Sequence, residues 1–142
     1  MTISQLSVFV ENKQGSMSGI AEVLAEAGID IRALTIADTT DFGILRLIVR
    51  NPEEAKKVLQ EKNFVVTINQ VVGVEVPDEV GGLARVLRIL DDALINIEYM
   101  YDFLAIKKEK AYIIIRVENN AKTVDLLEKN GIRCIEDSDI VF

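Results

Sequence analysis

The second half of this sequence repeats the first after a shift of about 66 positions. Under this shift apolar positions coincide, so that Val8 falls on Val74, and a glycine is shared between Gly15 and Gly81. Coincident apolar positions alone would show only that the two halves have the same order of elements. The shared glycine indicates a duplication, because glycine serves where the backbone needs a conformation that other residues avoid.

Polar positions repeat under the same shift. Asn12 falls on Asp78, and Asp30 falls on Asn96. Each pair exchanges one short oxygen-bearing side chain for another, and such side chains cap backbone groups or hold small ligands. The sequence therefore predicts two copies of one structural unit.

The first half alternates between the periodicities of strands and helices. Residues 4–10 alternate between polar and apolar side chains, which is typical of a half-buried strand. Met17, Ile20 and Leu24 recur at helical spacing, and Gly28 stands where a glycine commonly ends a helix. The predicted elements are a strand over 4–10, a helix over 17–27, strands over 29–37 and 44–49, a helix over 52–62 and a strand over 64–68.

The start of the second predicted helix is marked by Asn51 as a capping residue, by Pro52 at the first helical position and by two following acids. The second half is expected to repeat the order of the first. Its mixed-charge residues 107–110 are expected to form a solvated hairpin tip. Its predicted elements are a strand over 71–76, a helix over 82–93, a hairpin over 96–117, a helix over 121–130 and a strand over 132–135.

Each half thus has the order βαββαβ, which is the ferredoxin-like order of an α+β fold. We place the two domains at residues 1–69 and 70–142. No linker rich in Pro, Gly or Ser separates them, and each is small for an independent core. We therefore expect one continuous antiparallel eight-stranded sheet with four helices on one face. Several strands are apolar on both sides, so a homodimer is expected to bury the other face.

Charge and length exclude several classes of partner. Sixteen basic and 23 acidic residues give a net charge of −7 over 142 residues, opposite to the basic footprint of nucleic-acid-binding proteins. The apolar runs are too short to span a bilayer, so no membrane partner is expected. The first residues lack the positive and apolar segments of an export signal, which predicts a cytoplasmic protein.

The residue types limit the chemistry that the chain can perform. It has no His and one cysteine, Cys134, so an internal disulfide and the usual zinc sites are excluded, and we expect neither metal nor cofactor. His is also the commonest general acid or base near neutral pH. Cys134 lies in an apolar strand and is expected to be a buried hydrophobe. Asp91 and Asp92 are adjacent on a helix, point about 100° apart and are expected to be solvated.

The residues that follow the first strand of each half resemble the ACT domain, a small-molecule sensor of amino-acid metabolism. Residues 11–17, an apolar helix and residues 27–31 carry the resemblance in the first half, and residues 77–83 and 93–97 carry it in the second. It covers nearly the whole chain as a tandem ACT protein. The resemblance implies binding of a free amino acid that changes the activity of a partner, such as an enzyme of amino-acid metabolism.

Physical chemistry supports a ligand site at the loop that precedes the first helix of each half of the sequence. The loop ends in Gly15 or Gly81, and amide groups at a helix N-terminus favour a carboxylate. The ammonium group of an amino acid needs oxygen acceptors, which the repeated Asn and Asp side chains supply. The resemblance implies that effectors are held between neighbouring ACT units. The expected ligand-binding residues are Asn12, Gly15, Ser16, Met17, Asp30 and Ile31 in the first repeat, and Asp78, Gly81, Gly82, Leu83 and Asn96 in the second.

The two loops differ, since the second contains a proline and an added glycine, so the first is the favoured site and one occupied site per chain is expected. Asn12 and Asp78 have the alternative interpretation of turn or capping residues. Four aromatic residues cluster around the second hairpin: Tyr99, Tyr101, Phe103 and Tyr112. They could stack on RNA, but the acidic charge favours packing of a sheet face, and they could also line a pocket wall.

The sequence therefore predicts a non-catalytic, allosteric regulatory protein that binds a free amino acid at an interface between ACT units. The alternative is a ligand-independent regulatory or assembly subunit for an enzyme of amino-acid metabolism. A small enzyme of another type is a third hypothesis, against which the absence of His and of a convergent nucleophile and base counts.

Overall fold

The structure is a computed structural model that describes residues 1–103, 110–140 and 142. These residues fall into two compact units. The N-terminal unit consists of Ser4–Asn69 with Phe142, and the C-terminal unit consists of Met1–Ile3 with the described residues of 70–140. Among the helices of this part of the chain, none is long and apolar enough to cross a membrane.

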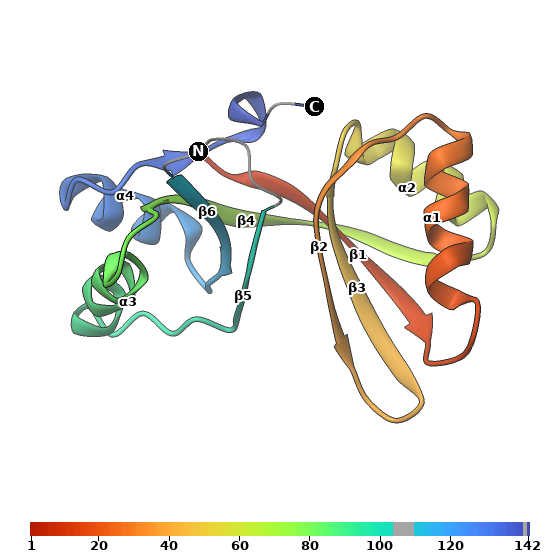
Figure 1. The fold of residues 1–142 in the computed structure, drawn as a ribbon, viewed down its shortest axis with the longest axis horizontal. Coiled ribbons are helices and arrows are strands. Elements are labelled where there is room, and N and C mark those ends of the chain that lie inside the picture. Colours follow the sequence, from red (N-terminus) through yellow and green to blue (C-terminus); the bar gives the residue numbers. More distant parts are fainter. Residues whose placement is uncertain (104–109, 141) are drawn as a thin grey trace. The chain divides into compact units, whose positions relative to one another are not determined.

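The N-terminal unit has the order βαββαβ that the sequence predicts. Its strands lie in the order β2-β3-β1-β4, and β1 and β2 each pair antiparallel with β3 (Figure 1). The elements are β1 (Ile3–Glu11), α1 (Ser16–Glu26), β2 (Ile31–Asp38), β3 (Phe42–Val49), α2 (Pro52–Glu61) and the first residues of β4 (Val65–Pro77).

One face of this sheet carries the core of the N-terminal unit. Alternate residues of β1, from Leu6 to Val10, lie opposite alternate residues of β3 and are fully or almost fully buried. Ile20 and Leu24 of α1 and Leu59 of α2 pack onto them. Both helices therefore cover the same face, as the period-two and helical spacings require.

The C-terminal unit repeats this architecture with the order β5-β6-β4-β7. Its core joins alternate residues of β4 and β6 to Val86 and Leu90 of α3 and Leu127 of α4, so these two helices also share one face. The elements are the remainder of β4, α3 (Gly82–Asp92), β5 (Tyr99–Asp102), β6 (Lys110–Arg116), α4 (Asn120–Lys129), β7 (Cys134–Ile135) and a 3-10 turn over Asp137–Asp139.

The expected eight-stranded sheet is wrong in its strand count. The sheet of the described residues has seven strands, because the predicted strands over 64–68 and 71–76 are one strand, β4. The intervening Asn69 and Gln70 have no turn-forming neighbours and remain extended. Ser7 donates a hydrogen bond to the Asn69 side chain at 2.9 Å, and Gln70 Oε1 accepts one from Thr2 at 2.8 Å.

Two local expectations also need correction or remain outside the structure. Asn51 occupies the N-cap position of α2, but its backbone is left-handed and its side chain makes no capping hydrogen bond. Its counterpart Asn119 does cap α4, accepting from the backbone N–H of Lys122 at 3.0 Å. The predicted solvated hairpin tip at residues 107–110 lies, except for Lys110, outside the described residues.

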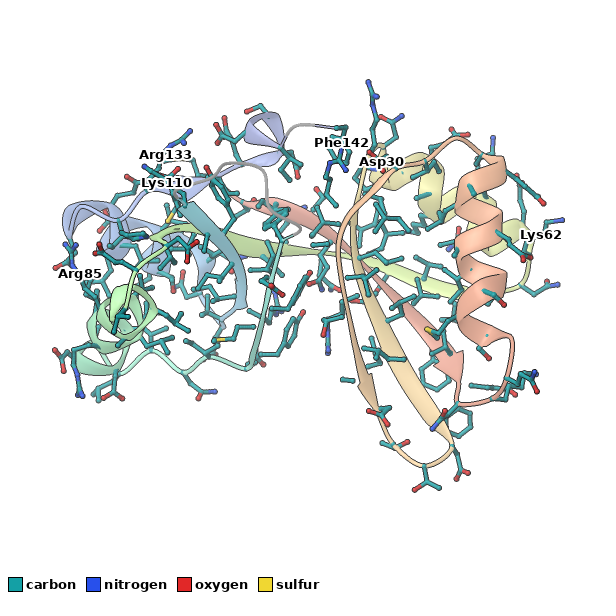
Figure 2. The ribbon with its side chains drawn as sticks, viewed as in Figure 1. Asp30, Lys62, Arg85, Lys110, Arg133 and Phe142 are labelled. Carbon is teal, nitrogen blue, oxygen red and sulfur yellow. The ribbon has the colours of Figure 1, made fainter. Side chains whose placement is uncertain are left out.

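A buried carboxylate interrupts the apolar strand β4. Glu75 is 9% exposed and lies on the sheet face opposite the helices. It accepts hydrogen bonds from Lys110, from Arg133 at 3.1 Å and from the Tyr112 hydroxyl at 3.3 Å. Arg133 also contacts Asp139 at 2.7 Å. Figure 2 shows Lys110 and Arg133 close together in this unit. We call these five residues the Glu75 cluster.

The two cations control the ionisation of Glu75. Burial raises its pKa, but the hydrogen bonds from Lys110 and Arg133 outweigh burial and hold the pKa below its ordinary value of 4.5. Burial, followed by the nearby Glu75 carboxylate, raises the pKa of Tyr112, so its hydroxyl stays protonated and donates. The Glu75 cluster thus ties β4 to β6 and β7 and has no unpaired acid or base to offer a substrate.

The helix ends of the two units differ at one position. α1 is followed by Gly28 with φ of 69°, whereas α3 is followed by Leu94 with φ of 59°. Both residues donate backbone hydrogen bonds to the last helical turn, at 3.0 Å and 2.9 Å. A side chain in this left-handed conformation is strained, and Leu94 is 92% exposed, so little burial offsets the strain.

Replacing Leu94 with glycine is therefore expected to stabilise the protein. Leu94→Gly relieves the backbone strain and should raise the free energy of unfolding by about 0.5–1 kcal/mol. The matched control is Gly28→Ala, which should lower it by about 1 kcal/mol, because a Cβ there meets no atom within 4 Å and only backbone strain counts. Urea unfolding followed by circular dichroism measures both. Loss of stability in Leu94→Gly would show that the exposed side chain contributes more than the strain.

The Glu75 cluster predicts a pH-dependent contribution to stability. Glu75→Gln should lower the free energy of unfolding by about 2 kcal/mol at pH 7, where the paired carboxylate is ionised. A carboxyl whose folded pKa is depressed stabilises the protein above its unfolded pKa, and the contribution disappears as pH falls through the folded pKa. The difference between wild type and variant should therefore shrink below about pH 4.5.

The control for this measurement is Asp125→Asn, which removes an exposed ion pair with Lys129 on α4. Such a pair contributes less than about 0.5 kcal/mol, so this variant should resemble wild type at every pH. Urea unfolding between pH 3 and pH 7 compares the three proteins. A Glu75→Gln difference that is independent of pH would contradict an ionised, hydrogen-bonded Glu75.

Candidate ligand-binding site

The loop between the first strand and first helix has the same backbone in both units. Gly15 precedes α1 with φ of 88° and ψ of −11°, and Gly81 precedes α3 with φ of 88° and ψ of −7°. This left-handed conformation favours glycine. Neither helix start is capped by a side chain. The Ser16 N–H already donates to the Lys13 carbonyl at 3.3 Å and the Gly82 N–H to the Glu79 carbonyl at 3.1 Å, so an anion would bind the later amide groups of the first turn.

The loops differ in the space beside the helix start. A Cβ built on Gly82 would overlap the backbone carbonyl of Pro77, so position 82 accepts only glycine. The equivalent position in the N-terminal unit is Ser16, which carries a side chain. In the C-terminal unit the loop backbone itself thus fills the volume that the Ser16 side chain occupies in the N-terminal unit.

Asn12 joins the N-terminal loop to the hairpin beside it. Its side-chain amide donates to the carbonyl oxygens of Thr39 at 3.2 Å and Thr40 at 3.3 Å, and its backbone N–H donates to Asp41 at 2.8 Å. These bonds orient the side chain so that its oxygen is the end able to accept from a ligand. They also show that Asn12 has a structural role.

A hollow lies beside the N-terminal loop. Phe9 and Phe42 form its apolar part as stacked rings with centroids 5.2 Å apart. Lys13 and Ser16 of the loop lie at the rim of the hollow. Lys13 forms an ion pair with Glu11 at 3.2 Å. The lining residues are Phe9, Val10, Glu11, Lys13, Ser16, Phe42, Asn63, Phe64 and Val65.

The sequence analysis did not identify the apolar lining of this hollow. The available signal was an aromatic or β-branched residue at a solvent-facing strand position, since Phe9 stands between the buried Val8 and Val10. Strand parity places such a residue on the sheet face opposite the core, and Phe9 is 48% exposed.

Asp30 lies at the other end of the unit from this loop. It follows α1, whose 11 residues place it roughly 16 Å along the helix axis from Gly15. Figure 2 shows Asp30 beyond the end of α1 that leads into β2. Its carboxylate pairs with Arg32 at 2.9 Å, and its backbone carbonyl accepts from Arg50 at 3.0 Å. One unit therefore does not bring Asn12 and Asp30 together, and Ile31, at the start of β2, packs against the core.

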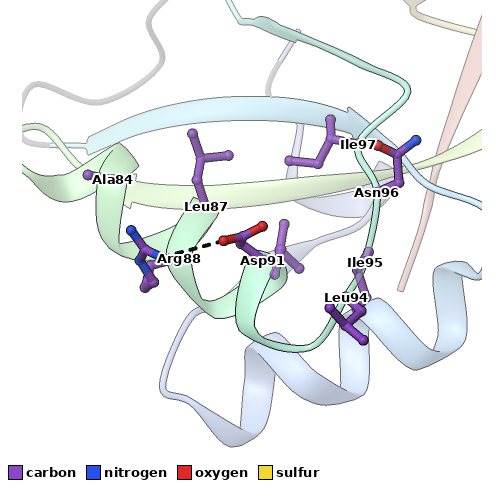
Figure 3. Close-up of a pocket in the computed structure, with 9 residues that line it drawn as sticks. Ala84, Leu87, Arg88, Asp91, Leu94, Ile95, Asn96 and Ile97 are labelled. Atoms are coloured by element: carbon purple, nitrogen blue, oxygen red, sulfur yellow. Dashed lines mark hydrogen bonds and ion pairs between the residues drawn. The ribbon is translucent and has the colours of Figure 1, made fainter.

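Asn96 lies at the corresponding end of the C-terminal unit and borders an open hollow (Figure 3). Leu87, Leu94 and Ile97 make this hollow largely apolar, and Arg88 pairs with Asp91 at 3.4 Å on its rim. As expected from the sequence, Asp91 and Asp92 are exposed. The full lining is Ala84, Leu87, Arg88, Leu90, Asp91, Leu94, Ile95, Asn96 and Ile97.

The remaining predicted residues cluster at the loops. Met17 and Leu83 are exposed apolar side chains in the first turns of α1 and α3. Asp78 is exposed in the C-terminal loop, next to Gly81. The structure thus groups the predicted site residues at two loops and, separately, at two helix-to-strand junctions.

The surfaces beside the two loops have diverged. Glu75 and Tyr112 lie opposite one another in the β4–β6 pairing, as Phe9 and Ile44 do in the β1–β3 pairing. The C-terminal unit therefore has an ion cluster where the N-terminal unit has the Phe9–Phe42 stack. A single acid within a run of valines was the sequence signal for Glu75.

Comparison with solved structures finds close and distant relatives of this architecture. Protein BT0572 from Bacteroides thetaiotaomicron is 41% identical, with a TM-score of 0.89 over 95% of this chain and 92% of that one. The regulatory subunit of aspartate kinase from Thermus thermophilus is 15% identical, with a TM-score of 0.65 over 89% and 91%. The latter similarity shows the fold alone.

No curated protein matches the sequence. A family model described as an ACT domain pair matches residues 1–142, which is the whole chain. The duplicated βαββαβ units and the repeated glycine loops agree with that match. The chain therefore belongs to the ACT domain pair family.

Proposed function

We propose that this protein is a non-catalytic regulator that binds a free amino acid through the β1–α1 loop of its N-terminal unit. Membership of the ACT domain pair family supports the proposal. The observation that carries it is the open hollow beside the Gly15 loop, where uncapped helix amides adjoin an apolar surface. An amino acid needs both, since its carboxylate favours a helix N-terminus and its side chain needs an apolar or complementary wall.

The expected ligand contacts divide between two groups. Gly15 and Met17 would offer backbone groups to the carboxylate, with the Asn12 oxygen as an acceptor for the ammonium group. Ser16, whose N–H already donates to the Lys13 carbonyl, would shape the site. Gly81, Gly82, Leu83 and Asp78 form the corresponding but tighter loop, so we propose one occupied site per chain.

Asp30, Ile31 and Asn96 lie too far along their helices to reach the loop of their own unit. We therefore propose that Asp30 and Asn96 act as acceptors for a ligand held by the loop of a neighbouring ACT unit in a homodimer, with Ile31 adjoining Asp30. A ligand that bridges two units stabilises one arrangement of them, and only such a difference in affinity can shift an equilibrium. The readout would be an altered contact with a partner, such as an enzyme of amino-acid metabolism.

A second function is supported by a separate observation. The Asp30 carboxylate is already paired with Arg32, and the Asn12 amide is already bonded to Thr39 and Thr40. Two of the four polar side chains are thus satisfied without a ligand. A ligand-independent regulatory or assembly subunit would have this property.

The two functions are separated by a thermal-melt screen against the twenty free amino acids. A ligand that binds only the folded protein raises the melting temperature, and at a concentration 100 times the dissociation constant it adds about 2.7 kcal/mol. We expect a selective upward shift with one amino acid or a few related ones. Isothermal titration calorimetry then measures the affinity and stoichiometry. No shift with any amino acid at 10 mM would overturn the sensor and favour the assembly subunit.

Matched substitutions test which loop binds. Asn12→Ala should abolish the ligand-dependent rise in melting temperature, because it removes the proposed acceptor and releases the loop from Thr39 and Thr40. Asp78→Ala changes the equivalent position of the other loop and should leave the rise intact. The melting temperatures without ligand control for folding. The reverse pattern would assign binding to the C-terminal loop.

A further inference from the structure

Three apolar side chains of the N-terminal unit are exposed at the hollow beside the β1–α1 loop. Phe9, Phe42 and Val65 are 48%, 47% and 66% exposed, and all three line the hollow. Phe9 and Phe42 are diagonal neighbours, because Phe9 pairs with Ile44 and Phe42 pairs with Glu11 in the β1–β3 ladder. Val65 begins β4, which lies on the other side of β1 from β3. We call Phe9, Phe42 and Val65 the apolar trio.

Two members of the apolar trio have charged counterparts in the C-terminal unit. Phe9 corresponds to Glu75, because the two residues occupy the same place in the first strand of their units. Phe42 corresponds to Lys110, because each stands two residues before the residue that lies opposite Phe9 or Glu75. The diagonal pair of rings in one unit is therefore a diagonal ion pair in the other.

The third member also has a charged counterpart. The helices α2 and α4 are each followed by a residue with positive φ, Asn63 at 68° and Gly131 at 76°. In both units the next residue donates a backbone hydrogen bond into the preceding helix. Val65 and Arg133 come directly after that residue. Val65 therefore corresponds to Arg133, and the whole apolar trio corresponds to three members of the Glu75 cluster.

The C-terminal unit closes these three positions with its own side chains. Glu75 is 9% exposed and accepts hydrogen bonds from Lys110 and, at 3.1 Å, from Arg133. The apolar trio has no charged or hydrogen-bonding side chain, and its two stacked rings remain about half exposed. The N-terminal unit thus keeps an apolar surface open where its duplicate is filled, and such a surface suits an apolar group of a ligand.

The size and charge of the hollow limit what this group can be. Its volume is about 280 Å³, just below the range of about 300–1,000 Å³ that is usual for small-molecule pockets. That space suits one amino-acid side chain. At the rim Lys13 and Glu11 are already paired at 3.2 Å, so they offer little to a charged side chain. An aromatic ring, in contrast, can stack on the exposed rings of Phe9 and Phe42.

We propose that the apolar trio makes this site selective for a free aromatic amino acid. The ligand ring lies against Phe9 and Phe42 beside Val65, while the later amide groups of the first turn of α1 face the ligand carboxylate. The members of the apolar trio are thereby specificity-determining residues. The inference rests on the proposed function, because it names the side chain of the amino acid that the N-terminal loop would hold.

Isothermal titration calorimetry of the full chain tests this selectivity. L-phenylalanine, L-tyrosine and L-tryptophan are compared with L-leucine, L-aspartate and L-lysine. At least one aromatic amino acid should bind about tenfold or more tightly than any of the other three, because only a ring can stack on the rings of the trio. N-acetyl-L-phenylalaninamide, which resembles an aromatic residue within a protein, should not bind, because it lacks the ammonium and carboxylate groups.

Matched substitutions locate the selective surface. Phe9→Leu keeps an apolar side chain but removes the ring, and should weaken binding of the aromatic ligand by about tenfold. Tyr99→Leu is the control, because it removes one ring of the Tyr99–Tyr101 stack, whose centroids are 6.4 Å apart in the C-terminal unit. Its affinity should equal that of wild type. Melting temperatures without ligand control for folding in both variants.

A triple variant copies the C-terminal residues into the N-terminal unit. Phe9→Glu, Phe42→Lys and Val65→Arg together install the ion-pairing residues at positions where the duplicate unit accommodates them. This variant should melt cooperatively and lose binding of the aromatic ligand. Binding that persists in a folded triple variant would overturn the inference. If the triple variant does not fold, the comparison of Phe9→Leu with Tyr99→Leu decides.

The outcomes separate this inference from the proposed function. Selective binding of a non-aromatic amino acid would overturn the inference and leave the amino-acid sensor intact, whereas binding of no amino acid would overturn both. An aromatic ligand whose affinity is unchanged in Phe9→Leu, or is equally reduced in Tyr99→Leu, would overturn the role of the apolar trio. Binding of N-acetyl-L-phenylalaninamide as tight as that of L-phenylalanine would replace the free amino acid with an aromatic residue of a protein partner.

Discussion

The continuity of strand β4 is the constraint on which both units depend. Its first residues pair within the N-terminal unit, and its remainder lies between β6 and β7 in the C-terminal unit. Each backbone N–H and C=O that is buried in a sheet needs a partner. At Gly73 the neighbouring side chains of Ile3 and Ile135 occupy the space of a Cβ, so a larger residue there would require these side chains to shift. One uninterrupted strand thereby organises strands from both ends of the sequence.

The duplication has conserved the backbone of the two units and changed what their surfaces can do. Gly15 and Gly81 have nearly identical dihedral angles, so the two loops start their helices in the same way. Beside one loop lies an aromatic stack, and beside the other lies the Glu75 cluster. A carboxylate that already accepts from two cations is a structural group, whereas an exposed aromatic stack leaves a surface to be covered. This asymmetry supports binding at the N-terminal loop.

The placement of the candidate site shows where sequence reasoning was limited. The glycine loops could be located from the repeat, because the left-handed turn before a helix leaves a residue signature. Asn12 and Asp30 were grouped by residue type, although an 11-residue helix separates them. Distance along a helix is rigid, so two polar residues at its ends can share a ligand only if they come from different units. Similarly, Asn51 is a residue type that commonly caps helices, but its backbone is left-handed and its side chain makes no capping hydrogen bond.

The sequence by itself determined the duplicated βαββαβ order, the burial of one face and the acidic, His-free chemistry, because periodicity, turn residues and composition are local properties of the chain. It also determined that Cys134 is buried, since its strand is apolar. Only the tertiary structure decided that residues 65–77 form one strand, that Glu75 is paired and that Leu94 is strained. Each of these depends on neighbours that are distant in sequence or on a backbone angle that residue type does not specify.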